Sequence, residues 1–196
     1  MPLVTLVSGG LDSTVMAVLA QRQTREQFPL FLDYGQLCCE REWRACRRVH
    51  QQLGLRIPAR MNLSGFGKMV SSGLTSRKKR LNEDAFLPGR NLLFLVAGAG
   101  YACEKGADTV CIGLLSEANR LFPDQTIAFL KGAEAILQTV TMRKLKFVAP
   151  LMRFTKAEIV ALARKLGVSG TYSCHAGTAK PCGVCLSCME TIGLKE

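Results

Sequence analysis

Aromatic residues, acidic residues and long apolar runs are all scarce in this sequence. Aromatic side chains make up 7% of the 196 residues, too few for a surface that stacks the bases of nucleic acid. No uninterrupted apolar run reaches the roughly 18 residues that indicate a membrane span. The opening residues, M-P-L-V-T, lack the basic start and the cleavage site of a secretory signal. We therefore expect a cytoplasmic protein with no membrane partner.

The shortage of acidic residues leaves a strong positive charge. There are 26 lysines and arginines against 15 aspartates and glutamates, a net charge of +11. Such an excess favours a polyanionic partner, either nucleic acid or a substrate that carries phosphate. The R-K-K-R run at residues 77–80 is most simply a solvated loop. With so few aromatic residues, direct nucleic-acid binding is not expected.

Short apolar stretches alternate with helical patterns along the chain. Stretches that are apolar throughout are typical of strands that are buried on both faces of a sheet. The clearest helix begins near residue 155, because Thr155 and Glu158 form a capping box and Gly167 is a natural stop. The pattern predicts an α/β fold with a mostly parallel five-stranded sheet and helices on both faces. The predicted strands lie near residues 3–7, 28–32, 56–63, 109–112 and 147–151.

Two segments interrupt this alternation. Residues 64–88 are polar and rich in glycine and serine, which predicts a mobile insert. The last part of the chain carries a cluster of cysteines. We therefore expect a domain of residues 1–170, with its insert, and a C-terminal tail of residues 171–196.

A glycine-containing loop follows the first predicted strand. Residues 8–13 read S-G-G-L-D-S and fall at the carboxyl end of a strand, where ligands of parallel sheets bind. The glycines let several backbone N–H groups aim at one point, and the next helix adds its positive end. Asp12 would repel a phosphate, and a Mg²⁺ ion between the two would resolve that conflict. The alternative is an ordinary turn in which Asp12 or Ser13 caps the helix.

Four cysteines in the tail have a spacing that suits a metal. They are Cys174, Cys182, Cys185 and Cys188. Zinc prefers four tetrahedral ligands, and a set of four thiolates leaves no open position for chemistry. We expect a structural zinc site that stabilises the tail, with an iron–sulfur cluster as the competing assignment. The other five cysteines show no ligand spacing and are expected to be buried, small apolar side chains.

The loop at residues 8–13 resembles the S-G-G-x-D-S signature of the PP-loop ATP pyrophosphatases, which release pyrophosphate as they adenylate a substrate oxygen. Further motifs are D-Y-G-Q at residues 33–36, P-G-R-N at 88–91 and T-K-A-E at 155–158. Together with the four cysteines, they make the chain similar to the 7-cyano-7-deazaguanine synthase (QueC) family. The resemblance spans almost the whole chain and implies a Rossmann-like PP-loop fold.

The resemblance also implies an activity. This family converts 7-carboxy-7-deazaguanine and ammonia to 7-cyano-7-deazaguanine, through an acyl adenylate and an amide, in queuosine biosynthesis. The implied cofactors are ATP, Mg²⁺ and Zn²⁺, and the implied catalytic residues are Asp12 and Arg90. The insert would be a lid that keeps water from the acyl adenylate. The residues implied to bind ATP are Val7, Ser8, Gly9, Gly10, Leu11, Asp12, Ser13, Thr14, Tyr34, Arg90, Asn91 and Gly113.

Several of these residues also have ordinary structural explanations. Arg90 could form a salt bridge or flank a helix, and Asn91 could be a helix cap. Tyr34 and Gly113 could simply be residues at strand ends. No general acid or base is identified, because His50 falls on a polar helix face and His175 lies beside a metal cysteine.

The sequence departs from the family where the acid would be recognised. Leu37 and Cys38 follow Y-G-Q, where the family often has a histidine. Residues 116–125 replace the usual acidic stretch and Y-P-D-C; Asp124 is kept, but it could be a helix cap. A second hypothesis is therefore a related ligase that adenylates a different carboxylate, including one on a protein, and stops at an amide. A nucleic-acid-binding protein that has kept the ATP fold is a third, and a homodimer is left open.

Overall fold

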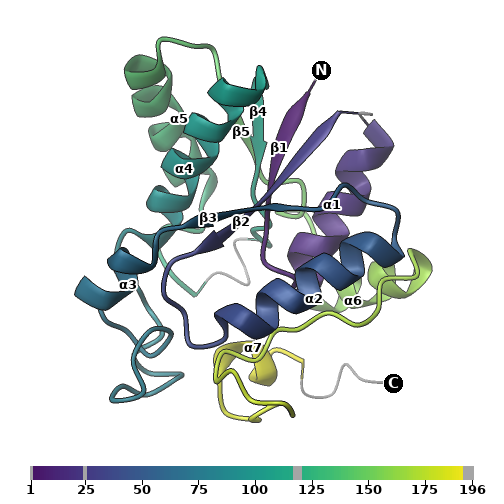
Figure 1. Cartoon of the computed structure of the whole chain (residues 1–196), viewed down its shortest axis with the longest axis vertical. Coiled ribbons are helices and arrows are strands. Elements are labelled where there is room, and N and C mark those ends of the chain that lie inside the picture. Colours follow the sequence, from purple (N-terminus) through teal and green to yellow (C-terminus); the bar gives the residue numbers. More distant parts are fainter. Residues whose placement is uncertain (1, 24–25, 117–120, 192–196) are drawn as a thin grey trace.

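A parallel β-sheet forms the centre of the molecule. The computed structural model describes residues 2–23, 26–116 and 121–191 (Figure 1). All neighbouring strands pair in parallel, in the order β3-β2-β1-β4-β5. The prediction of a five-stranded parallel sheet is confirmed. The strands are β1 (Leu3–Val7), β2 (Gln27–Asp33), β3 (Ala59–Asn62), β4 (Thr109–Cys111) and β5 (Lys146–Val148).

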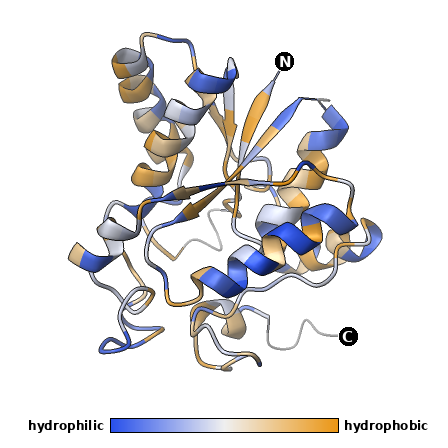
Figure 2. Ribbon diagram, viewed as in Figure 1, coloured by the Kyte–Doolittle hydropathy of each residue, from blue (hydrophilic) through white to orange (hydrophobic). Residues whose placement is uncertain are grey.

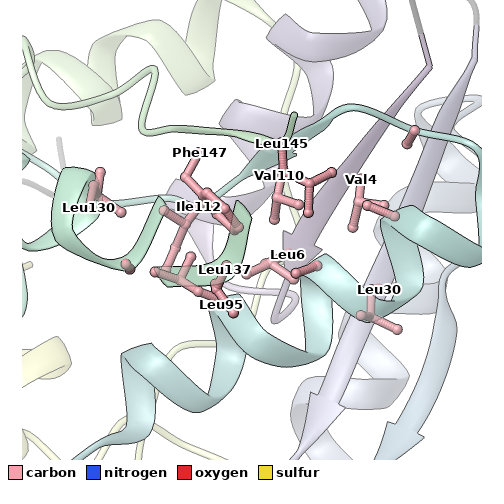
Figure 3. Close-up of a cluster of buried hydrophobic side chains, with 14 of the residues drawn as sticks. Val4, Leu6, Leu30, Leu95, Val110, Ile112, Leu130, Leu137, Leu145 and Phe147 are labelled. Atoms are coloured by element: carbon pink, nitrogen blue, oxygen red, sulfur yellow. The ribbon is translucent and has the colours of Figure 1, made fainter. Parts of the chain in front are cut away.

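Helices cover both faces of this sheet, as predicted. Alternate residues of a strand point to opposite faces, so β1 contributes to clusters on both sides of the sheet. Val4 and Leu6 pack with α4 and α5 (Figure 3), whereas Leu3 and Val7 pack with α1, α2 and α6. The helices are α1 (Leu11–Gln23), α2 (Cys39–Gln52), α3 (Ser64–Met69), α4 (Arg90–Lys105), α5 (Ile127–Thr141), α6 (Lys156–Lys165) and α7 (Leu186–Met189).

The small residues of α4 let that helix lie close to the sheet. A Cβ atom on Gly98 would come within 2.9 Å of Val110 Cγ1 and 3.2 Å of Leu6 Cδ2. Because a side chain at this position would push α4 outward, Gly98 fixes the position of the helix whose first residues reach the carboxyl ends of the strands.

The capping box of α6 is confirmed. The Glu158 N–H donates to Thr155 Oγ1 at 3.3 Å, and the Thr155 N–H donates to a Glu158 carboxylate oxygen at 2.7 Å. Gly167, with φ +69°, follows the last turn. This local chemistry fixes the start of α6, and with it the position of Lys156.

The segment of residues 64–88 folds over the end of β2. It begins with α3 and continues in turns, and its Leu74, Ala85 and Leu87 are buried. The Leu37 N–H donates to the Leu74 carbonyl oxygen at 2.8 Å, which ties the segment to the D-Y-G-Q region. The mobility of this segment, and its role as a lid, stay predictions.

The tail runs beside α2 with little secondary structure of its own (Figure 1). Figure 2 shows that α2 is largely hydrophilic. Two of its arginines donate to tail carbonyl oxygens: Arg41 to Gly177 at 2.7 Å and Arg48 to Gly170 at 2.6 Å. The Tyr172 N–H donates to the Gly9 carbonyl oxygen at 2.9 Å. The tail is thus held against the loop that follows β1.

Two further predictions can be compared with the structure. His50 is not on a polar face: it is 0% exposed, and its Nδ1 lies 2.8 Å from the Arg56 carbonyl oxygen, because the chain folds back over the end of α2. Of the five cysteines outside the tail, only Cys103 is partly exposed, so the prediction of buried thiols is largely confirmed.

Within the described residues, no helix combines the length and the apolar character that a membrane crossing requires.

Candidate active site

A cavity of about 290 Å³ opens at the carboxyl ends of the strands. Its walls come from the loop after β1, the ends of β2 and β4, the first turn of α4, the start of α6 and the tail. Ten of the predicted ATP-binding residues line it, whereas Gly9 and Thr14 do not. The ten are Val7, Ser8, Gly10, Leu11, Asp12, Ser13, Tyr34, Arg90, Asn91 and Gly113.

Gly9 and Thr14 lie behind the cavity wall and shape the loop. Gly9 has φ +80°, and a Cβ there would lie 2.6 Å from the Glu42 carbonyl oxygen of α2. Only glycine fits this contact and this backbone conformation. The buried Thr14 donates its hydroxyl to the Gly10 carbonyl oxygen at 2.8 Å. Both residues therefore hold the loop in position from behind.

Inside the loop, serine hydroxyl groups and backbone groups are joined in a small network. The Ser8 N–H donates to Ser13 Oγ at 3.1 Å, and the two hydroxyl oxygens also lie 3.1 Å apart. A Cβ atom on Gly113, two residues past the end of β4, would lie 3.4 Å from Ser13 Cα. The loop is thus a compact turn on the cavity wall, with α1 beginning at Leu11. A helix start of this kind attracts anions.

Asp12 is paired with a lysine from the far end of the domain. Lys156 Nζ lies 2.9 and 2.8 Å from the two carboxylate oxygens of Asp12, and 3.6 Å from a carboxylate oxygen of Glu190. The Lys156 side chain is 11% exposed and lines the cavity. Lys156 belongs to the T-K-A-E motif, but the sequence alone did not predict it as a site residue. The lysine charge balances that of Asp12 beside the 8–13 loop.

Arg90 lies over two aromatic rings on the cavity wall. Its guanidinium carbon is 6.0 Å from the centre of the Tyr34 ring and 5.9 Å from that of Phe94, and these rings pack 5.2 Å apart. Arg90 forms no ion pair with any described residue, and its buried Nε has no hydrogen-bond partner among them. The salt-bridge alternative therefore has no support in the described part of the chain, and the guanidinium is available to an anion in the cavity.

Asn91 and Asp124 are not helix caps. Gly89 is the N-cap residue of α4, and Thr126 caps α5 by accepting the Phe129 N–H at 3.1 Å. Asn91 instead donates its side-chain amide to the Asp124 carbonyl oxygen at 3.2 Å. It thus connects α4 to the described part of the divergent 116–125 segment, of which residues 117–120 lie outside the described residues.

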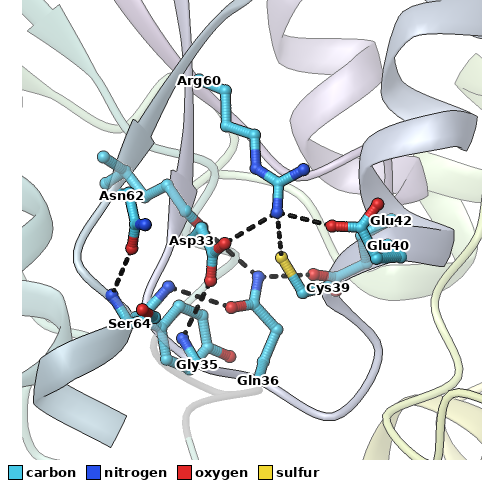
Figure 4. Close-up of polar contacts among 11 residues, drawn as sticks. Asp33, Gly35, Gln36, Cys39, Glu40, Glu42, Arg60, Asn62 and Ser64 are labelled. Carbon is cyan, nitrogen blue, oxygen red and sulfur yellow. Dashed lines mark hydrogen bonds and ion pairs between the residues drawn. The ribbon is translucent and has the colours of Figure 1, made fainter.

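A buried polar chain lies at the end of β2 (Figure 4). The Tyr34 N–H donates to Gln36 Oε1 at 3.0 Å, and Gln36 Nε2 donates to Glu42 Oε2 at 2.9 Å. Tyr34, Gln36 and Glu42 all line the cavity. Burial raises the pKa of Glu42, against the effects of the Gln36 and Cys38 hydrogen bonds and of the Arg90 charge. Sequence reasoning missed Glu42; the signal was a charged residue on the buried stripe of α2 between Cys39 and Cys46.

The four tail cysteines converge as a metal site requires. Their sulfur atoms all lie within 4.8 Å of one another, and those of Cys182 and Cys188 are 4.0 Å apart. A tetrahedral zinc with bonds of about 2.3 Å separates its sulfur ligands by about 3.8 Å, so the set fits zinc. Burial opposes ionisation of Cys174, but hydrogen bonds from the Thr178 hydroxyl and the Cys182 N–H lower its pKa and favour the thiolate.

Residues next to the four tail cysteines form part of the cavity wall. His175, Leu186, Ser187 and Glu190, which lie beside or between the cysteines in sequence, all line the cavity. His175 Nδ1 is buried with no partner among the described residues. Burial and the charges of Arg90 and Lys156 lower the His175 pKa to about 4, so this ring is neutral near pH 7. Sequence reasoning assigned His175 a structural or solvated role and did not place it in the cavity.

The strand order, the loop after β1 and the position of the cavity at the carboxyl ends of the strands are features of one class of protein. This class is the Rossmann-like α/β proteins with a PP-loop, in agreement with the sequence-based prediction. Which member of this class the chain represents follows from its similarity to known proteins.

The chain belongs to the QueC family: the model of the family described as "Queuosine biosynthesis protein QueC" matches residues 2–193. The chain is 30% identical to the 7-cyano-7-deazaguanine synthase of Campylobacter curvus, over 98% of this chain and 95% of the relative. It is 32% identical to the protein of the same name from Methanothermobacter thermautotrophicus, with coverages of 95% and 90%. It is also 32% identical to "7-cyano-7-deazaguanine synthase 2" of Desulfitobacterium hafniense, with coverages of 98% and 86%. The family resemblance expected from the motifs is confirmed.

Proposed function

We propose that this chain is an ATP-dependent ligase that converts 7-carboxy-7-deazaguanine and ammonia to 7-cyano-7-deazaguanine. The observation that carries the proposal is the meeting of the 8–13 loop, Arg90 and Lys156 around one cavity. The two cations and the start of α1 surround a space that suits phosphate groups, and the family relatives bear the name of this synthase.

The first step activates an unreactive carboxylate. A carboxylate oxygen attacks the α-phosphorus of ATP, the bond from that phosphorus to the bridging oxygen breaks, and pyrophosphate leaves. In the proposed arrangement the N–H groups and hydroxyls of the 8–13 loop bind the phosphates, and Arg90 holds the acid or the phosphates by paired N–H donors. Asp12 and Lys156 would orient the leaving group, with Asp12 as the ligand of Mg²⁺, which neutralises phosphate charge when bound.

The remaining steps replace oxygen by nitrogen. Ammonia attacks the carbonyl carbon of the acyl adenylate, AMP leaves, a proton is released, and an amide results. The amide oxygen then attacks the α-phosphorus of a second ATP and displaces pyrophosphate. Loss of AMP and of the two N–H protons gives the nitrile, so each nitrile formed consumes two ATP molecules. Water has to be excluded throughout, and the 64–88 segment and the tail both contribute residues to the cavity wall and could serve this purpose.

The test is product analysis of the purified protein with 7-carboxy-7-deazaguanine, Mg²⁺-ATP and ammonium. We expect release of AMP and pyrophosphate and formation of the nitrile, read by mass spectrometry. Asp12→Ala should lower AMP release by about 100-fold or more, because it removes a charged group at the phosphates. Asp108→Asn is the matched control. Asp108 lies just before β4, at the amino ends of the strands and away from the cavity, so this variant should retain activity. Retained turnover in Asp12→Ala would refute the role assigned to the loop.

A second candidate has a specific observation in its favour. The divergent residues fall at the acid-recognition region, and there Cys38 is buried against Glu42 where family members often have histidine. A related ligase that adenylates another carboxylate, including one on a protein, and stops at the amide would use the same phosphate contacts. An amide as the final product, or AMP release only with a different acid, would favour this second function.

A further inference from the structure

One buried charged group in the cavity has no part in the ATP chemistry proposed above. Glu42 lies on the sheet-facing side of α2, is 9% exposed and lines the cavity at the end of β2. None of the described ion pairs includes it. Removing a carboxylate from water costs several kcal/mol unless hydrogen-bond donors replace the lost water molecules. Donors from a bound ligand would therefore be strongly favoured here.

The protein fixes the orientation of this carboxyl group. Gln36 Oε1 already accepts the Tyr34 N–H, so the amide of Gln36 has to present its Nε2 to Glu42 and to the Leu32 carbonyl oxygen (Figure 4). Glu42 is therefore an acceptor in this chain of contacts. A carboxylate has about four lone-pair positions, and the bonds from Gln36 and Cys38 use two of them. Capacity remains for donors from the cavity.

The surrounding walls suit a flat ring. Leu6, Leu30 and Leu32 line the cavity from the strands, and Phe94 and Tyr34 line it with their packed rings. Apolar walls with a few oriented polar groups are typical of sites for small heterocycles. A planar ring between these walls can present its polar edge to Glu42.

We propose that Glu42 determines which heterocycle the cavity accepts, by taking hydrogen bonds from the ring N–H and the exocyclic amino group of an aminopyrimidinone edge. This is the edge that a deazaguanine acid presents, so the inference rests on the proposed function. An adenine edge offers one amino donor beside an acceptor nitrogen, which would face a carboxylate lone pair. The two bases are thus distinguished by the pattern of donors.

The test exchanges one acceptor of Glu42 for a donor. Glu42→Gln presents an oxygen and an N–H group, which match a ring N–H beside a carbonyl oxygen. We compare 7-carboxy-7-deazaguanine with its 2-oxo analogue, 7-carboxy-7-deazaxanthine. The wild type should prefer the 2-amino acid by about 100-fold in kcat/KM, and Glu42→Gln should lower kcat/KM for that acid by about 100-fold and raise it for the 2-oxo acid. The KM for ATP should stay unchanged.

Glu40→Gln is the matched control on the same helix, because Glu40 is exposed and bonds Arg60 at 2.6 Å instead of lining the cavity. It should keep the wild-type preference. An unchanged preference in Glu42→Gln, or a raised KM for ATP with no change in preference, would overturn the role of Glu42 alone. A wild type that uses both acids equally overturns it without any variant. A wild type that releases no AMP with either acid overturns the proposed function as well.

Discussion

The two sides of the cavity are built on different physical principles. On one side, the 8–13 loop joins a strand that is buried along its whole length to a helix that packs on the sheet. On the other side, the tail has one short helix and a small cluster formed around its cysteines. The loop therefore takes its geometry from the hydrophobic core of the sheet, whereas the tail takes its geometry from four side chains and a few hydrogen bonds. It should therefore be possible to disrupt the structure of the tail while the 8–13 loop and the sheet stay folded.

The largest expected effect separates the two sides through the metal. Cys185→Ser removes one of the four converging thiols, which is 0% exposed, so a metal held by these cysteines should be lost while the sheet stays folded. Because His175, Ser187 and Glu190 line the cavity, AMP release should fall by about 100-fold or more. Metal content, circular dichroism and AMP release measure this. Cys103→Ser, on α4 and outside the cluster, is the control. Full activity without metal would show that the tail does not depend on its cysteines.

A pair of glycines sharpens the same comparison. Gly9 and Gly183 both have left-handed backbones, with φ +80° and +76°. A Cβ on Gly9 would lie 2.6 Å from backbone atoms of α2, whereas a Cβ on Gly183 meets nothing within 4 Å. Gly9→Ala should lower the free energy of unfolding by about 3 kcal/mol or more, and Gly183→Ala by about 1 kcal/mol. Equal losses in urea unfolding would mean that the loop is not held by close contact with α2.

The same division explains how much the sequence predicted. The 8–13 loop and the capping box at Thr155 are local patterns that occur where they were expected. Each predicted strand overlaps an observed one, although β3 and β5 are shorter than the predicted ranges 56–63 and 147–151. Residues whose role depends on distant neighbours were missed. Lys156 meets Asp12 across 144 positions of the chain, and nothing near either residue indicates that contact.

From the loop motif, more residues were predicted to line the cavity than the structure shows. Gly9 and Thr14 belong to the motif by sequence, yet they lie behind the wall, because a turn presents only some of its residues to one side. In α2, Glu42 and His50 are both buried among apolar residues. A helix that is covered on one side by the sheet and at its end by residues 53–56 buries polar side chains, which the hydropathy pattern alone did not indicate.

The burial of His50 on α2 should make the free energy of unfolding depend on pH. Burial lowers the pKa of His50, so the folded state favours the neutral ring more than the unfolded chain does. As the pH falls below the ordinary value near 6.5, the unfolded state takes up the proton first, and the free energy of unfolding should fall by about 1 kcal/mol for each pH unit.

His50→Asn can keep a donor to the Arg56 carbonyl oxygen, which lies 2.8 Å from His50 Nδ1, but it cannot titrate. Urea unfolding at pH 7 and pH 5 should therefore show a weaker pH dependence in the variant. An identical slope in both proteins would mean that His50 is not the group responsible.

The smallest expected effect concerns the opposite side of α2, where it contacts the tail. Arg41 and Arg48 donate to the carbonyl oxygens of Gly177 and Gly170, and a surface hydrogen bond from a charged group contributes about 1 kcal/mol. Removing either arginine should let the tail open about 5-fold more often and leave the sheet unaffected. The Tyr172 amide, bonded to Gly9 at 2.9 Å, is the reporter in hydrogen exchange, and Arg44→Ala on the same helix is the control. If Arg41→Ala speeds exchange in β1 as much as at Tyr172, loop and tail open together, and the two sides of the cavity form one cooperative unit.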